Sequence, residues 1–185
     1  FIAVPYDNGQ YSVHTNYAKA WNLIGFDGQS LVDYQNNNIA PEFKDSGDMD
    51  FATILFKTEG IGNGISDYLD NTIAFASFAA SRTNPNANRN PMTSGMLGSQ
   101  DSETGTSVWL GVNAPCPLTP DDAKIGFEWN KGSKYWRSMT YAEDTYAGSK
   151  IATRGQAWEV YRTQKLTEAL SFGVSYVLMQ YDYTG

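Results

Sequence analysis

Glu128 and Glu159 are the side chains whose type and spacing come closest to a catalytic pair. Each lies on the polar side of an alternating segment, so the two could approach each other across neighbouring strands. Two carboxylates about 5–10 Å apart in a cleft would suit glycoside hydrolysis. The sequence outlines no such cleft, and we favour carboxylates lining a polar surface. We predict no catalytic residues and no enzyme activity.

Nucleophilic and phosphate-binding chemistry have little support. His14 is the only histidine, it lies inside an alternating segment, and no G-x-S-x-G motif accompanies it. Gly60–Gly64 is rich in glycine but lacks the following lysine of a phosphate-binding loop. We interpret His14 as a polar-face residue and Gly60–Gly64 as a hairpin turn.

The residues that could bind a metal ion or act as a reactive thiol also have simpler structural explanations. Some acidic residues could bind Ca²⁺ in loops, but they form no EF-hand pattern, so solvated carboxylates are favoured. These residues are Asp45, Asp48, Asp50, Asp101 and Glu103. Cys116 is the single cysteine, which makes neither an internal disulfide nor a zinc site. We predict no cofactor and no metal site.

The composition fits both a barrel wall that separates two environments and a soluble β-sandwich, and taken alone it slightly favours the soluble class. Charged residues make up 18% of the 185-residue chain, below the quarter or so of soluble domains, whereas aromatic residues make up 14%. The mean hydropathy is nevertheless only -0.44. A net charge of -7 argues against a nucleic-acid partner. No apolar run reaches the length of a membrane-spanning helix, but a spanning strand needs only about 9–11 residues, half of them polar.

A period of two residues recurs along the chain. Within 169–183, Leu170 to Leu178 present an apolar face at even positions, and Ser171, Gly173 and Ser175 form the opposite face. Residues 11–23 alternate in the same way, with Lys19 interrupting the apolar side. Both segments are long for strands of a globular domain, in which five or six residues are typical.

The remaining segments complete a meander. Further strands are predicted at 1–6, 49–59, 71–81, 107–113, 124–130, 134–141 and 156–162, with tight turns at 7–9 and 130–133. Residues 27–48 and 84–106 are polar and are expected to form long loops, the first with room for a short helix. The predicted fold is an all-β antiparallel up-and-down meander forming all or part of a transmembrane β-barrel, as one domain over 1–185.

Several runs also resemble a known group of proteins. GSKYWRS at 132–138 and YDYTG at 181–185, with the longer runs at 56–83 and 105–119, are similar to uncharacterised porin-like outer-membrane proteins of Gram-negative bacteria. The resemblance implies an outer-membrane β-barrel with a presumed transport role and no catalytic residues. Members of that group are longer, and the chain starts at Phe1 without a signal peptide, so we expect a processed chain or a barrel fragment.

The barrel interpretation assigns the two faces of the strands. The polar face is expected to line a pore, with Lys124, Glu128, Asn130, Glu159, Ser171 and Ser175 as candidates. The aromatic girdle at the lipid boundary is expected to include Trp109, Trp129, Trp158, Tyr181 and Tyr183. Trp136 is also expected within a strand, and sugar stacking is the alternative role for these tryptophans. Passive diffusion of small polar solutes, or a structural role, follows as the expected function.

Two other classes of protein remain open. A secreted, soluble β-sandwich that binds glycans would bury the apolar faces between two sheets. A barrel could instead act as a sheath for another envelope protein, such as an electron-transfer protein. The partners expected for a barrel are outer-membrane lipid and small polar solutes, with a homo-oligomer or an envelope partner as further alternatives.

Overall fold

The computed structural model describes residues 1–62, 64–86, 97–138 and 148–183. Its main body is one antiparallel sheet of eight strands, in the order β1-β2-β5-β6-β7-β8-β9-β10. The strands are β1 (Ile2–Asp7), β2 (Tyr11–Ala20), β5 (Gly47–Glu59), β6 (Ile73–Pro85), β7 (Thr104–Pro115), β8 (Ala123–Gly132), β9 (Gly155–Lys165) and β10 (Ser171–Tyr181). Each strand of this sheet pairs with the strand of the same sheet that follows it in sequence, and β3 and β4 form a separate pair. The predicted all-β meander is therefore confirmed.

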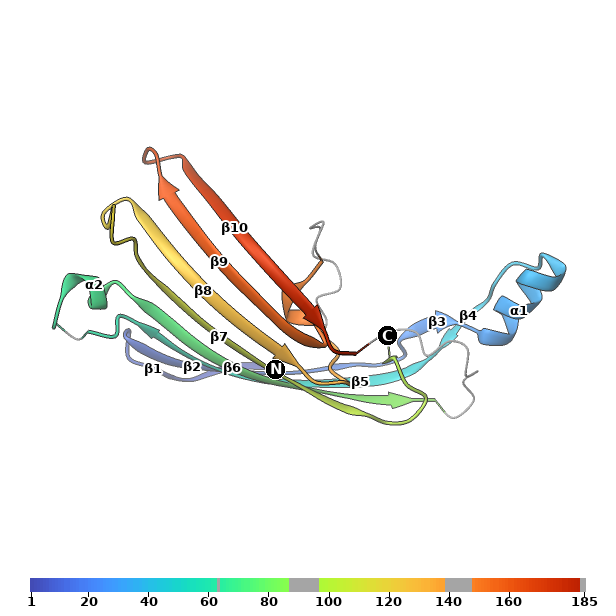
Figure 1. Cartoon of the computed structure of the whole chain (residues 1–185). Helices are drawn as coiled ribbons and strands as arrows, with labels where there is room; N and C mark the ends of the chain where they lie inside the picture. Colours follow the sequence, from blue (N-terminus) through green and yellow to red (C-terminus); the bar gives the residue numbers. More distant parts are fainter. Residues whose placement is uncertain (63, 87–96, 139–147, 184–185) are drawn as a thin grey trace.

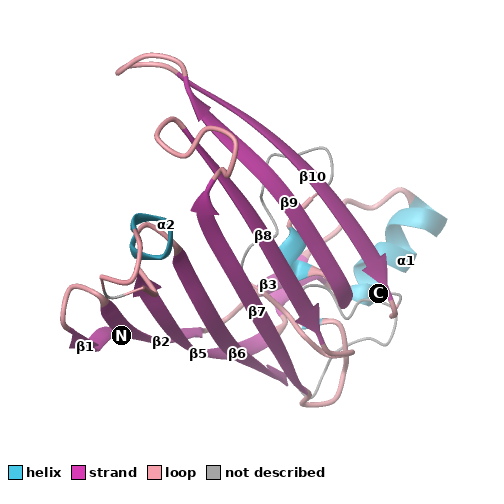
Figure 2. Cartoon of the chain, turned by 60° about the vertical axis from the view of Figure 1, so that its left-hand side comes forward, coloured by secondary structure: helices cyan, strands magenta, loops and turns pink. Residues whose placement is uncertain are grey.

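The sheet is curved but not closed. Figure 1 shows a trough, with β1 at one edge and β10 at the other. The turned view in Figure 2 shows the strands running side by side across the whole sheet. No pairing joins β1 to β10 among the described residues. The predicted antiparallel meander is therefore present, but the described sheet does not close into a barrel.

The connections differ in length at the two ends of the strands. Short turns at 8–10, 116–122 and 166–170 lie at one end, together with the connection 60–72 that contains α2 (Asp67–Asp70). The long connections 21–46, 86–103 and 133–154 all lie at the other end. The first of these forms an arm made of β3 (Ile24–Phe26), α1 (Gly28–Asn37) and β4 (Phe43–Asp45), which projects beyond the sheet (Figure 1).

Three sequence-based boundaries are wrong. Residues 134–138 form turns and coil instead of a strand, while 139–141 lie outside the described residues. The segment 130–133 is not a hairpin turn, because β8 continues to Gly132 and the chain returns in β9 only after η2 (Lys150–Ala152). Strand β2 ends at Ala20, before Leu23.

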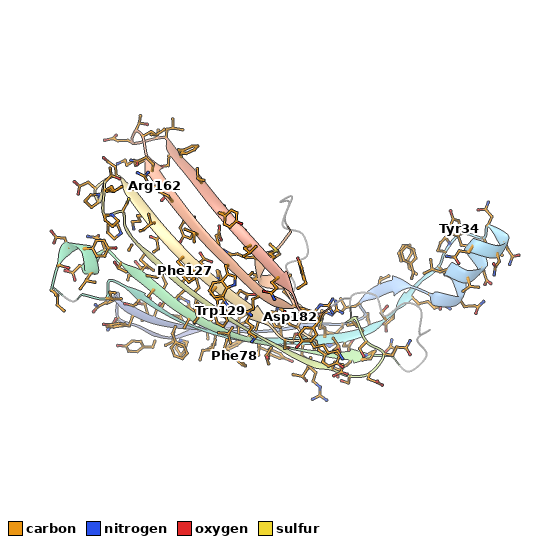
Figure 3. All side chains as sticks on the ribbon, in the orientation of Figure 1. Tyr34, Phe78, Phe127, Trp129, Arg162 and Asp182 are labelled. Atoms are coloured by element: carbon orange, nitrogen blue, oxygen red, sulfur yellow. The ribbon has the colours of Figure 1, made fainter. Side chains whose placement is uncertain are left out.

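The two faces of the sheet carry different side chains. We call the concave face, on which η2 lies, the inner face, and the opposite side the outer face (Figure 1). Phe78, Phe127 and Trp129, labelled in Figure 3, belong to the outer face. Tyr176 and Leu178 on β10 share this face and are 69% and 52% exposed. The predicted apolar stripe of β10 is therefore uncovered by protein in the described part of the chain.

Small residues on the inner face let the sheet bend. Gly111 lies opposite Phe75, and Gly126 lies opposite Tyr161, so each aromatic ring lies over the glycine of its neighbouring strand. A Cβ atom built on Gly126 would lie 2.0 Å from the Tyr161 ring. Glycine kinks covered by cross-strand aromatic rings are a known source of sheet curvature.

In the described part of the chain, one small cluster of buried apolar side chains lies beside the long connections. Met49 and Phe51 of β5 pack with Leu97, and Leu23 adds a partly buried side chain. No helix of the described residues is long and apolar enough to cross a membrane.

Candidate functional site

The register brings the predicted pore-lining residues onto the inner face. Glu128 lies directly opposite Glu159, and Lys124 lies opposite Thr163, which in turn faces Gly173 between Ser171 and Ser175 on β10. Asn130 lies two positions along β8 from Glu128 and shares its face. The sheet therefore places this whole set of candidates on one surface; their role in lining a pore stays a prediction.

Glu128 and Glu159 form the charged centre of this surface. Like charges directly opposite each other on neighbouring strands destabilise a sheet unless a cation compensates them. Lys150 of η2 supplies that cation: its Nζ lies 2.7 Å from Glu128 Oε2 and also forms an ion pair with Glu159. We call Lys150, Glu128 and Glu159 the ion-pair cluster.

Trp109 connects the ion-pair cluster to β7. Its indole N–H donates a hydrogen bond to Glu128 Oε2 over 2.8 Å, and the Lys150 ammonium lies 5.6 Å from the centre of a Trp109 ring. The Phe75 ring packs edge-on against Trp109 at 4.7 Å between centroids. Glu128 is thus held by a cation and by a neutral donor at the same oxygen.

The cluster is only partly exposed, and this affects the ionisation of Lys150. The side chains of Lys150, Glu128 and Glu159 are 20%, 12% and 15% exposed. Burial alone would lower the pKa of Lys150, but hydrogen bonds and charge from the two carboxylates outweigh it and raise the pKa above its ordinary value. Lys150 therefore stays charged near neutral pH, and with both carboxylates ionised the cluster carries one net negative charge.

Close packing holds the β8–β9 connection onto the inner face. A Cβ atom on Gly132 would lie 2.2 Å from the Thr153 carbonyl oxygen, so only glycine permits this approach. Trp136 is buried, and its indole N–H donates to the Ile151 carbonyl oxygen over 2.8 Å. The Arg137 amide donates to Ser81 Oγ on β6. These contacts place η2, and Lys150 with it, over the inner face of β8 and β9.

A groove of about 430 Å³ runs beside the ion-pair cluster. Its lining is mainly apolar and includes Trp136 and Ile151 of the connection, and the sheet adds uncharged polar side chains, namely Asn16, Thr53 and Ser77. His14 also lines it and is hydrogen-bonded to Ser12 two residues away on the same strand, a local contact of a polar strand face.

Asn130 forms part of the same lining. It is 2% exposed, and its amide nitrogen donates to Ser107 Oγ over 3.0 Å, while its Oδ1 has no hydrogen-bond partner among the residues that the structure describes. The predicted pore-lining asparagine is thus a buried side chain that bonds β8 to β7.

The predicted aromatic girdle is divided between the two faces. Trp129 and Trp158 are direct cross-strand partners on the outer face, with ring centroids 5.9 Å apart. Trp109 is on the inner face, so the girdle prediction is wrong for it: the outward residues of β7 are Val108, Leu110 and Val112.

The remaining aromatic candidates lie at the end of the sheet or off it. Tyr181 is opposite Gly155 at the last pair of β10, which gives it inner-face parity, and Tyr183 lies beyond the strand. Trp136, expected within a strand, lies in the β8–β9 connection.

Three of the five candidate loop carboxylates have partners within the protein. Asp45 Oδ1 accepts a hydrogen bond from the Gly47 amide, and Asp48 Oδ1 accepts one from the Asn22 amide. Asp50 pairs with Lys19 at 3.6 Å. No group of three or more His, Cys, Asp or Glu side chains in the described ranges could hold a metal ion. Cys116 is buried at the end of β7.

Sequence reasoning missed Lys150, because alternation assigns faces only within strands. One signal was available: two glutamates on the polar side of adjacent strands need a cation between them. Lys150 is a basic residue of the segment that joins those two strands.

Comparison with known proteins finds no match among curated proteins and none among solved structures. A family described as "Protein of unknown function (DUF3373)" matches the chain over residues 1–185. The chain belongs to the DUF3373 family.

Proposed function

We propose that this chain forms the wall of a bacterial outer-membrane β-barrel that lets small polar solutes diffuse along its inner face. The observation that carries the proposal is the outer face, where large apolar side chains lie exposed on strand after strand. They include Phe56, Phe78, Leu110, Val112, Phe127, Trp158, Val160, Val174, Tyr176 and Leu178. An exposed apolar surface of this extent marks contact with lipid or with another protein.

The apolar side chains form a band with a polar margin at the long-connection end of the strands. At the long-connection end, the outer-face positions of β6, β8 and β9 are Arg82, Lys131 and Gln156. Trp129 and Trp158 lie one step inward, and Trp129 donates its indole N–H to Gln156 over 3.3 Å. Tryptophan between apolar and charged rows is typical of the lipid–water boundary.

Backbone pairing and strand length agree with a membrane environment. Lipid offers no hydrogen bonds, so every backbone group of a spanning strand must pair within a sheet. The inner strands β5 to β9 have 10–13 residues and pair on both sides. The proposal requires β1 and β10 to pair with further strands, because an open sheet edge does not occur in lipid.

The unequal connections also fit this class of protein. Outer-membrane barrels have short turns on the periplasmic side and longer loops on the outside. In our proposal the 116–122 and 166–170 turns face the periplasm, and the arm at 21–46 faces outward.

Electrophoresis after membrane fractionation tests the proposal. We expect the protein in the outer-membrane fraction, soluble only with detergent, and we expect the unboiled sample to migrate differently from the boiled one. Added to planar bilayers, the protein should produce ion conductance. A protein that stays monodisperse without detergent would refute the membrane proposal and favour the glycan-binding sandwich. A heat-modifiable barrel without conductance that co-purifies with an envelope protein would favour the sheath.

A further inference from the structure

The ion-pair cluster joins the β8–β9 connection to the sheet through charged side chains. Lys150 comes from the connection, whereas Glu128 and Glu159 come from the strands on either side of it in sequence. None of the described residues that line the groove beside the cluster is a Lys, Arg, Asp or Glu, and Trp109 belongs to both sites. A solute moving along the inner face past Trp109 would therefore pass these three charges.

We propose that Lys150 determines the charge selectivity of the solute path. This inference rests on the proposed function and adds a solute class to it. With Lys150 in place, one of the two carboxylates is neutralised, and uncharged polar solutes pass beside a site with one net negative charge. Without Lys150, two adjacent carboxylates would attract cations and repel anions.

The environment makes one charge matter. Each side chain of the cluster is at most 20% exposed, so water screens these charges less than it screens surface residues. Rings of charged side chains determine selectivity in pores through the field that they create at a narrow point. One unit charge about 7 Å from the path, at an effective dielectric constant of about 60, changes the permeability of K⁺ and that of Cl⁻ roughly fourfold each and in opposite directions. The expected change in the ratio of K⁺ to Cl⁻ permeability is therefore roughly fifteenfold.

Lys150 also positions the connection, and the two roles need separate variants. Lys150→Gln removes the charge and the two-carboxylate contact. Lys150→Arg keeps the positive charge and the contact with the two carboxylates, so it should have the same selectivity as the original protein. Lys150→Gln/Glu128→Gln/Glu159→Gln removes all three charges while keeping the side chains nearly the same size. Lys19→Gln is the matched control, since Lys19 forms an ion pair with Asp50 on the outer face.

Reversal potentials in planar bilayers under a KCl gradient test the proposal. We expect the original protein to prefer K⁺ weakly, Lys150→Gln to increase the ratio of K⁺ to Cl⁻ permeability roughly fifteenfold, and Lys19→Gln to leave it unchanged. The triple variant should lose the preference for K⁺, and because it leaves no unpaired carboxylate it also decides the matter if Lys150→Gln fails to fold.

The outcomes separate the two proposals. Absence of conductance in the original protein would overturn the proposed function. Conductance with the same reversal potential in the original protein, Lys150→Gln and the triple variant would overturn only the role of Lys150. A shift of the same size in Lys19→Gln would also overturn it, because the effect would then reflect the charge of the whole protein.

Discussion

Lys150 illustrates how one side chain combines packing with charge. Burial favours the neutral amine, but two carboxylates favour the ammonium more strongly, so the pKa of Lys150 is raised. A group whose pKa is higher in the folded protein stabilises the fold below its ordinary pKa, and this contribution is lost as the pH rises through the folded-state pKa. The charge of Lys150 therefore adds to the packing that holds the connection on the sheet at neutral pH, and this contribution is lost only as the pH rises above the ordinary lysine pKa.

A pH titration of tryptophan fluorescence checks this behaviour. Trp109 contacts the cluster and Trp136 lies in the connection, so both report on it. We expect a transition above the ordinary lysine pKa of 10.5. Lys150→Arg should lack the transition, since arginine keeps its charge there. An identical transition in Lys150→Arg would mean that another group, such as a tyrosine, is responsible.

At the scale of the elements, the paired glycines and aromatic rings of the inner face decide the curvature of the sheet. Tyr161 lies over Gly126, and its hydroxyl accepts a hydrogen bond from Asn113 Nδ2 over 3.1 Å. A side chain at position 126 would displace the ring and break this bond. Gly173 of β10 lies on the same inner face, but a Cβ atom built on Gly173 would lie 3.9 Å from the nearest atom, which belongs to Thr163.

These two glycines should therefore respond differently to alanine. Gly126→Ala should destabilise the protein by about 1–3 kcal/mol, the usual cost of overpacking. Gly173→Ala should be neutral or slightly stabilising, because alanine loses less entropy than glycine on folding. The temperature at which the unboiled electrophoretic form disappears measures both. Equal effects of the two variants would contradict the role of the Gly126–Tyr161 pair.

Alternation made most strands predictable, since residues such as Leu170 to Leu178 repeat with the period of a strand. The end of β8 was not predictable, because Asn130-Lys131-Gly132-Ser133 has the composition of a turn although its backbone stays paired with β7 and β9. The inward position of Trp109 depends on register, and the position of Lys150 depends on contacts at Gly132 and Trp136. These are tertiary effects that no local pattern contains.

At the scale of the whole molecule, the two faces of the sheet require different side chains at positions that are adjacent in sequence. Val174 and Ser175 are adjacent on β10, but Val174 is opposite Arg162 and Ser175 is opposite Tyr161, on opposite faces. In a barrel, Val174 faces lipid and Ser175 faces the polar interior. An arginine on the lipid face near the bilayer midplane costs about 2–4 kcal/mol, whereas interior substitutions mainly alter selectivity.

Val174→Arg and Ser175→Arg form a matched pair, because they introduce the same side chain one residue apart. We expect Val174→Arg to reduce the heat-modifiable fraction in membranes strongly and Ser175→Arg to leave it close to the original level. Both positions are exposed in the sheet, so a soluble protein that leaves the outer face uncovered would tolerate both arginines. Equal tolerance would refute contact of the outer face with lipid.

The arm at 21–46 lies at the end of the strands that carries the long connections, and this difference between the two ends has a practical use. Its helix α1 ends at Asn37, and Asn38 follows with a left-handed backbone, φ 55°, well clear of the sheet in Figure 1. Exposed loop tips of this kind tolerate insertions. A short peptide tag placed after Asn38 should therefore be reached by antibody on intact cells, whereas a tag in the 166–170 turn should be reached only after the cells are opened. The arm would then serve as a carrier for displaying foreign epitopes.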